Sequence, residues 1–124
     1  MNILELKRNL KMSEWTPEDD KLVTLARGAR ARVSAESGAA LRDTTGRTYS
    51  GTNVNRGPLF VTAIELVVAQ AISSGSTGIE AVVVVADDVL VTAKDVDVVE
   101  AAGGVGVPVH VVDNTGTVLR TLYS

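Results

Sequence analysis

Residues 81–85 read Ala81-Val82-Val83-Val84-Val85, a run of apolar and mostly β-branched side chains that no polar residue interrupts. A run of this kind is typical of a central strand that is covered on both of its faces. We therefore expect a sheet with helices on both sides, and we interpret the rest of the chain outward from this strand.

Two helices are predicted before the central strand. The first covers about 17–34, because Thr16 can cap its free amides, Pro17 suits the first helical position and apolar residues then recur at helical spacing. The second covers about 60–74 and is apolar nearly all the way round. Since such a helix cannot face water on one side, we expect it to lie between the sheet and another subunit, in a homodimer or homotetramer.

Between these two helices the sequence predicts a β-hairpin. Its strands are expected at 38–42 and 47–50, because the turn 43–46 between them is rich in Asp, Thr and Gly. The following stretch, 51–57, is expected to be a loop.

Beyond the central strand we expect one more helix, over 92–102, and two more strands, over 108–112 and 117–122. The four-residue turn 113–116 allows the last two strands to pair only in antiparallel fashion. On the predicted helix, Val96, Val99 and Ala102 are expected to face inward. The acidic residues Asp95, Asp97 and Glu100 are expected to face outward.

This order of elements predicts an α/β fold, with a mixed five-stranded sheet in a three-layer α/β/α sandwich. The chain has 124 residues, so one domain over 16–124 is expected. Residues 1–15 are interpreted as a separate leader, because they are polar and lack strong periodicity. The leader is either loose or docked on the body or a partner through Ile3, Leu4 and Trp15.

Composition narrows the classes of function. The net charge of −3 gives no general attraction for nucleic acid, and the aromatic residues that would stack on bases make up only 3% of the chain. No stretch approaches the roughly 18 apolar residues of a membrane span. Because the chain has no cysteine, no disulfide can form, and a cytoplasmic location is expected. Neither a membrane nor nucleic acid is an expected partner.

Five short segments resemble, in their order along the chain, the motifs of the cytidine deaminase-like family. The ordered set is more specific than any one segment, and it spans roughly 20–122. The chain resembles above all a degenerate, actinobacterial type of member that lacks the zinc site. The segments are Gly38-Ala39-Ala40-Leu41, Gly51-Thr52-Asn53-Val54-Asn55, Thr62-Ala63-Ile64-Glu65-Leu66-Val67, Ser73-Ser74-Gly75 and the run from Pro108 to Gly116.

The resemblance fails at the residues that carry the family's chemistry. It implies that Thr62 replaces the first zinc ligand and Ile64 the proton-shuttling glutamate. The two thiolate ligands would fall within 90–94, where no side chain can bind zinc. Asn53 matches a substrate-contacting asparagine, whereas Asn55 replaces the glutamate that binds ribose. We expect no zinc or other cofactor and no hydrolytic deamination, since that reaction needs a metal-activated water and a carboxylate.

Three functions stay open. The first, which we favour, is a non-enzymatic structural or regulatory role as an oligomer, with an unidentified protein partner as a further option. The second is a nucleoside or nucleotide sensor with a vestigial pocket around Asn53 and Asn55, although both residues could instead cap the next helix from a loop. The third is a deaminase or other hydrolase of altered chemistry, with a metal held by Asp87 and Asp88 as one option. A solvated strand end is the plainer interpretation of these two residues.

Other patterns also have plainer interpretations than catalysis. His110 is the only histidine, and no spacing supports a triad with Ser50 and Asp113. The glycine-rich stretch 103–106 follows a helix, so it indicates a helix stop and not a phosphate loop. Six basic residues are expected on a solvated helix face or in a subunit contact: Lys7, Arg8, Lys11, Arg27, Arg30 and Arg32.

Overall fold

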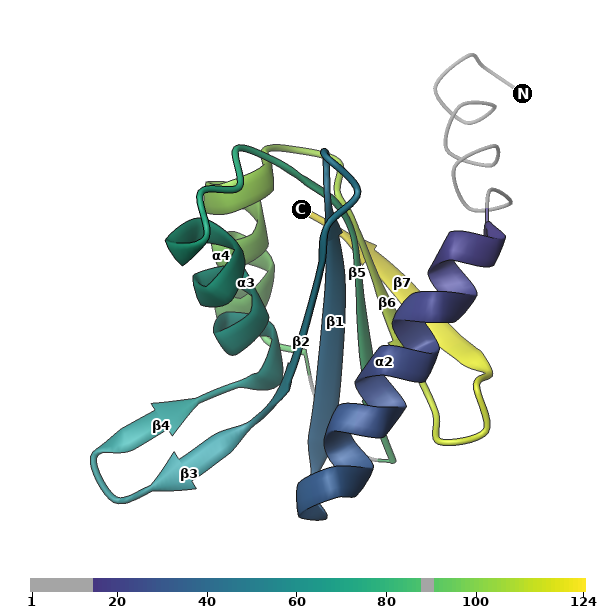
Figure 1. The fold of residues 1–124 in the computed structure, drawn as a ribbon, viewed down its shortest axis with the longest axis vertical. Coiled ribbons are helices and arrows are strands. Elements are labelled where there is room, and N and C mark those ends of the chain that lie inside the picture. Colours follow the sequence, from purple (N-terminus) through teal and green to yellow (C-terminus); the bar gives the residue numbers. More distant parts are fainter. Residues whose placement is uncertain (1–14, 88–90) are drawn as a thin grey trace.

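The computed structural model describes residues 15–87 and 91–124, so residues 1–14 of the predicted leader lie outside the described residues. The elements in chain order are α2 (Pro17–Val33), β1 (Ser37–Asp43), β2 (Thr48–Thr52), β3 (Val54–Arg56), β4 (Leu59–Val61), α3 (Ala63–Ser73), β5 (Ile79–Ala86), α4 (Ala93–Gly103), β6 (Pro108–Val112) and β7 (Val118–Tyr123). Figure 1 shows α2 on one side of the main sheet and α3 with α4 on the other. The predicted three-layer α/β/α arrangement is confirmed.

The main sheet has five strands in the order β2-β1-β5-β6-β7. Only β5 and β6 run parallel, and the other neighbouring pairs are antiparallel. The predicted mixed five-stranded sheet is therefore confirmed, with the valine-rich strand β5 at its centre. In the register, Val82 lies between Leu41 of β1 and Val109 of β6.

The run of valines in β5 is explained by the two layers that cover it. Val82 and Val84 belong to the core cluster under α3 and α4. Val83 and Val85 belong to a second cluster under α2. Because alternate side chains of a strand point to opposite faces, a strand covered on both sides needs an apolar residue at every position.

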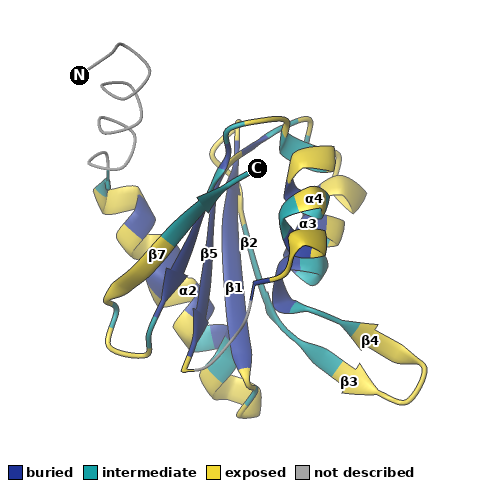
Figure 2. Cartoon of the chain, turned by 180° about the vertical axis from the view of Figure 1, so that it is seen from behind, coloured by how far each residue is buried: buried dark blue, intermediate teal, exposed yellow. Residues whose placement is uncertain are grey.

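The largest difference from the sequence-based prediction lies between β2 and α3. The stretch 51–57 was predicted as a loop and 60–74 as a helix, but the chain forms a two-stranded hairpin, β3–β4, that stands off the body (Figure 2). Gly57 adopts a positive φ of 60° at the turn, a conformation that glycine tolerates well. The helix begins only at Ala63, because Thr62 caps it.

Helix α3 is apolar nearly all round, and the protomer itself covers most of that surface. Val67 and Val68 are almost fully buried within the chain, whereas Ile72 is 56% exposed. The apolar surface of α3 that remains for another subunit is therefore smaller than its composition suggests. None of the described helices has the length and apolarity that crossing a bilayer requires.

Candidate functional site

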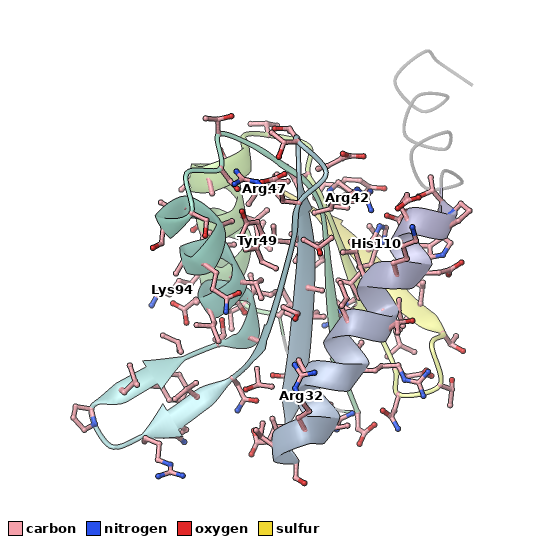
Figure 3. The ribbon with its side chains drawn as sticks, in the orientation of Figure 1. Arg32, Arg42, Arg47, Tyr49, Lys94 and His110 are labelled. Atoms are coloured by element: carbon pink, nitrogen blue, oxygen red, sulfur yellow. The ribbon has the colours of Figure 1, made fainter. Side chains whose placement is uncertain are left out.

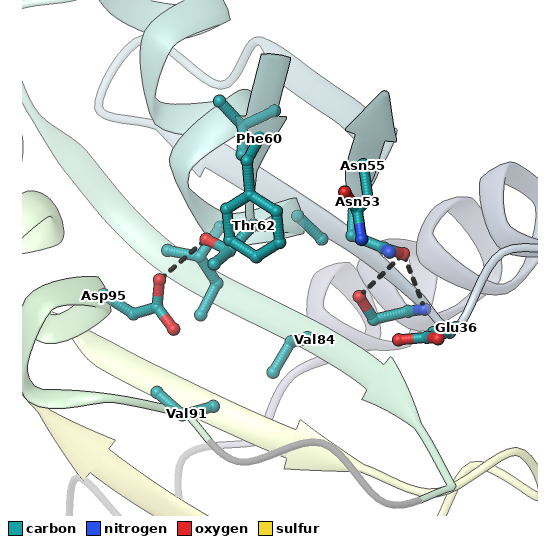
Figure 4. Close-up of a pocket in the computed structure, with 12 residues that line it drawn as sticks. Glu36, Asn53, Asn55, Phe60, Thr62, Val84, Val91 and Asp95 are labelled. Carbon is teal, nitrogen blue, oxygen red and sulfur yellow. Dashed lines mark hydrogen bonds between the residues drawn. The ribbon is translucent and has the colours of Figure 1, made fainter. Parts of the chain in front are cut away.

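Helices α3 and α4 begin side by side near the carboxyl-terminal half of β5, and their first residues border a pocket (Figure 4). Its volume is about 290 Å³. The polar lining consists of Glu36, Ser37, Asn53, Asn55, Thr62 and Asp95, and the apolar lining includes Phe60, Ile64, Val84 and Val91.

Thr62 caps α3 through a reciprocal pair of hydrogen bonds. Its Oγ1 accepts from the backbone N–H of Glu65 at 3.0 Å, and the Oε1 of Glu65 accepts from the backbone N–H of Thr62 at 2.9 Å. This capping box satisfies amides that the first turn of a helix otherwise leaves free. The Thr62 hydroxyl also donates to Oδ1 of Asp95, at 2.7 Å (Figure 4).

Asp95 belongs to an equivalent capping box at the start of α4. Its Oδ2 accepts from the backbone N–H of Thr92 at 3.2 Å, and Oγ1 of Thr92 accepts from the backbone N–H of Asp95 at 3.2 Å. The prediction that Asp95 faces outward is wrong, since the residue is only 3% exposed. Its carboxylate serves two helices at once, because one oxygen caps α4 and the other receives the hydroxyl of Thr62.

An ion pair joins the same two helix ends. Nζ of Lys94 lies 3.1 Å from Oε2 of Glu65. The hydrogen bond from the Thr62 amide lowers the pKa of Glu65, and Lys94 lowers this pKa further against the opposing effect of burial. Glu65 thus lies in the first turn of α3, at the positive end of the helix dipole, an arrangement that stabilises its charged form. We call Thr62, Glu65, Thr92, Lys94 and Asp95 the α3–α4 junction.

Asn53 and Asn55 line the pocket from the opposite side, next to β2 and on β3. Oδ1 of Asn53 accepts from the backbone N–H of Ser37 at 3.0 Å and from its hydroxyl at 3.2 Å. The structure therefore brings both predicted asparagines to one pocket. Neither of them caps α3, because Thr62 does so.

The side chains of this pocket do not fit a zinc ion. The Thr62 hydroxyl already accepts one hydrogen bond and donates another, and Ile64 offers only hydrocarbon. Within residues 15–87 and 91–124, no three His, Asp or Glu side chains are grouped so that they could hold a metal ion. Structural and catalytic zinc sites need three or four nitrogen, sulfur or carboxylate ligands.

The other sequence-predicted candidates lie away from this pocket. Asp87 forms an ion pair with Arg30 at 3.0 Å, and Asp88 lies outside the described residues. Ser50 is on β2 and His110 on β6, with two strands between them, so the structure does not assemble a triad. The stretch 103–106 ends α4, with Gly104 as its C-cap, which confirms the predicted helix stop.

Sequence reasoning missed Asp95 as a site residue. The signal was present, since Thr92 followed three residues later by Asp95 resembles a capping box, as does Thr62 followed by Glu65. Local spacing could thus locate both helix starts. The bond between Thr62 and Asp95, 33 residues apart, depends on how the two helices pack.

Comparison with known proteins agrees with the geometry. The profile of the family described as Cytidine deaminase-like matches residues 15–116. The cytidine deaminase from Burkholderia pseudomallei superposes with a TM-score of 0.73 and 22% identity, over 83% of this chain and 90% of that one. The cytidine deaminase from Mycobacterium leprae gives a TM-score of 0.65 and 20% identity, over 84% of this chain and 91% of that one.

At these identities the likeness to the solved structures is one of fold. A search of curated proteins finds no sequence relative. The family profile spans most of the chain, including the whole α3–α4 junction and the pocket. The chain therefore belongs to the cytidine deaminase-like family.

Proposed function

We propose that this protein is a catalytically inactive member of its family that acts as an oligomeric structural or regulatory protein. The observation that carries the proposal is the hydrogen bond from Thr62 to Asp95, at the position where the family resemblance puts a zinc ligand. A hydroxyl that is engaged in this way cannot bind a metal without breaking the α3–α4 junction. Ile64, in the place of the proton-shuttling glutamate, cannot transfer a proton.

A deamination assay tests the loss of activity. Purified protein is incubated with cytidine, with and without added Zn²⁺, and ammonia release is followed beside a working cytidine deaminase from another source. We expect release at the level of a protein-free blank under both conditions. Cytidine-dependent release that increases with protein concentration would overturn the proposal.

A second candidate function, nucleoside binding, is favoured by one specific observation. Asn53 and Asn55 line the same pocket, and Phe60 adds an aromatic ring to its wall. Two carboxylates, of Glu36 and Asp95, are also part of the lining, and none of the described residues that line the pocket is a lysine or arginine. Because negative charge repels phosphate, this pocket suits an uncharged nucleoside better than a nucleotide.

Thermal-shift measurements separate the two candidate functions. A nucleoside present at 100 times its dissociation constant should stabilise the protein by about 2.7 kcal/mol, which raises the melting temperature by several degrees at this size. The matched variant Asn53→Ala should lose that shift. Flat melting curves with nucleosides, bases and nucleotides alike would remove the sensor and leave the structural or regulatory role.

A further inference from the structure

A second hollow, with a volume of about 330 Å³, lies at the amino-terminal ends of β5 and β6. Its other walls come from the first turn of α2, the end of β1, the end of β7 and the turn that follows α4. The pocket of the candidate site borders the opposite half of β5, and the two cavities share no lining residue. The hollow is therefore a separate cavity.

Three titratable side chains with little exposure line this hollow. Asp19 is 5% exposed, and Arg42 and His110 are each 8% exposed. Figure 3 shows Arg42 and His110 near the first turns of α2. A concave site with a few convergent polar groups is the usual form of a small-molecule site, and none of these three side chains belongs to the α3–α4 junction.

The guanidinium group of Arg42 is only partly satisfied within the protomer. Its Nη2 donates to Oδ1 of Asp19 at 3.0 Å and to Oε1 of Glu80 at 3.3 Å. Its Nη1 is buried and has no hydrogen-bond partner among the described residues. Since folded proteins seldom leave a buried donor unpaired, Nη1 indicates that an acceptor oxygen of a ligand enters the hollow.

The charge of the lining disfavours a simple anion. Among the described residues that line the hollow, Asp19 and Glu80 are acidic and Arg42 is the one arginine or lysine. Burial lowers the pKa of His110, so its imidazole adds no positive charge at neutral pH. An anion such as phosphate would therefore meet an excess of negative charge at short range.

Glu80 offers the contact that an anion cannot use. Its side chain is 55% exposed, and its Oε1 accepts from Arg42. Its second oxygen, Oε2, accepts no hydrogen bond from another described residue. An ammonium group in the hollow would pair with this carboxylate, while an oxygen of the same molecule accepts from Nη1 of Arg42.

The remaining lining is largely apolar. Ile79, Ala81, Val107 and Pro108 contribute hydrocarbon to the hollow. A volume of about 330 Å³ lies at the lower end of the range for small-molecule sites, so the hollow suits a ligand with few heavy atoms. Such a ligand would place a small apolar group against these side chains.

We propose that the hollow binds a free α-amino acid with a small apolar side chain. The carboxylate of the amino acid accepts from Nη1 of Arg42, its ammonium group pairs with Glu80, and its side chain lies against Ile79 and Val107. Because the ligand has no net charge, it avoids the repulsion that a simple anion would meet. This proposal does not rest on the function proposed for the chain above.

Titration followed by NMR tests this site in the full chain. The ¹⁵N-labelled protein is titrated separately with glycine, L-alanine, L-valine and L-leucine, up to millimolar concentrations. We expect saturable shifts of the amide signals of Ala81, Val107 and His110 with at least one amino acid, and no shifts for Asn53 and Ile64 in the other pocket. Absence of saturable shifts in the hollow with all four amino acids would overturn the proposal.

Two analogues of the tightest-binding amino acid test whether both charged groups are recognised. For L-valine these are isovalerate, which lacks the ammonium group, and isobutylamine, which lacks the carboxylate. Each should bind about tenfold more weakly than the amino acid, a difference of about 1.4 kcal/mol. Equal affinity of the amino acid and either analogue would contradict recognition of the zwitterion.

The variant Glu80→Gln tests the ammonium contact at a position where the fold tolerates change, because this side chain is 55% exposed. The Kd of the amino acid should rise about tenfold in this variant. Glu100→Gln is the matched control, since Glu100 is exposed on α4 and does not line the hollow, and it should bind like the parent. An unchanged Kd in Glu80→Gln would overturn the proposal.

Discussion

Thr62 makes two hydrogen bonds at once, one to its own helix and one to its neighbour, and these two roles can be separated by mutation. Thr92 provides the matched case, because it caps α4 but its hydroxyl makes no hydrogen bond to another helix among the described residues. From the sequence alone, Thr62 could be interpreted as a poor metal ligand at the position of a zinc ligand of the family. The sequence could not predict the partner Asp95, because that contact depends on packing between helices and not on local spacing.

The variant Thr62→Val should therefore destabilise the protein more than Thr92→Val. Loss of a threonine cap typically costs about 1 kcal/mol, and a buried carboxylate left without its donor adds about 1–3 kcal/mol. The measurement is the free energy of unfolding in urea for both variants. Equal losses would show that the bond between Thr62 and Asp95 contributes nothing to stability.

Asp43 makes part of the stability dependent on pH. It is fully buried, and the hydroxyl of Ser76 donates to it at 2.6 Å, which together with Thr45 and Arg47 holds its pKa well below the ordinary value of 3.8. Because the folded state favours the charged carboxylate, this stabilisation is present above about pH 4 and is lost as the pH falls below that value.

The variant Asp43→Asn should consequently be less stable than the parent at neutral pH, with a difference that shrinks below about pH 4. Urea unfolding across this range measures it. Asp113→Asn is the matched control, because Asp113 occupies a similar turn but its side chain is partly exposed. The pKa of Asp113 is also lowered, chiefly by the hydrogen bond from Thr115. A pH-independent difference for Asp43→Asn would contradict the assignment.

At the scale of elements, periodicity predicted the helices and the central strands well, and it failed between β2 and α3. Each strand of the β3–β4 hairpin has three residues, too few to show an alternating pattern. The apolar residues Phe60 and Val61 were therefore assigned to the following helix, although the capping residue Thr62 marks its true start. A hairpin this short is defined by its glycine turn and not by periodicity.

Helix α3 is also where the predicted subunit contact can be tested. Val68→Asp should unfold the protomer whether or not an oligomer forms, because Val68 is only 1% exposed. Ile72 is 56% exposed, so Ile72→Asp should leave the fold intact and convert the assembly to monomers. Light scattering coupled to size exclusion measures the mass. An unchanged oligomer in Ile72→Asp would exclude this part of α3 from the contact.

At the scale of the whole molecule, the chain has the fold of its family. The polar groups at the first turns of α3 and α4 bond to one another. The consecutive valines of β5 fill the two apolar core clusters, and neither cluster includes a residue of the polar α3–α4 junction. That separation explains why the order of elements could be predicted from the sequence, whereas the α3–α4 junction emerged only from the packed structure.

Zinc titration by isothermal calorimetry tests the central claim most directly, namely that the α3–α4 junction has replaced the metal site. We predict no saturable binding of Zn²⁺ to the purified protein, and the same result for Asp95→Ala. Tight binding of one Zn²⁺ per chain that disappears in Asp95→Ala would contradict the account, because it would show that the junction opens to hold a metal.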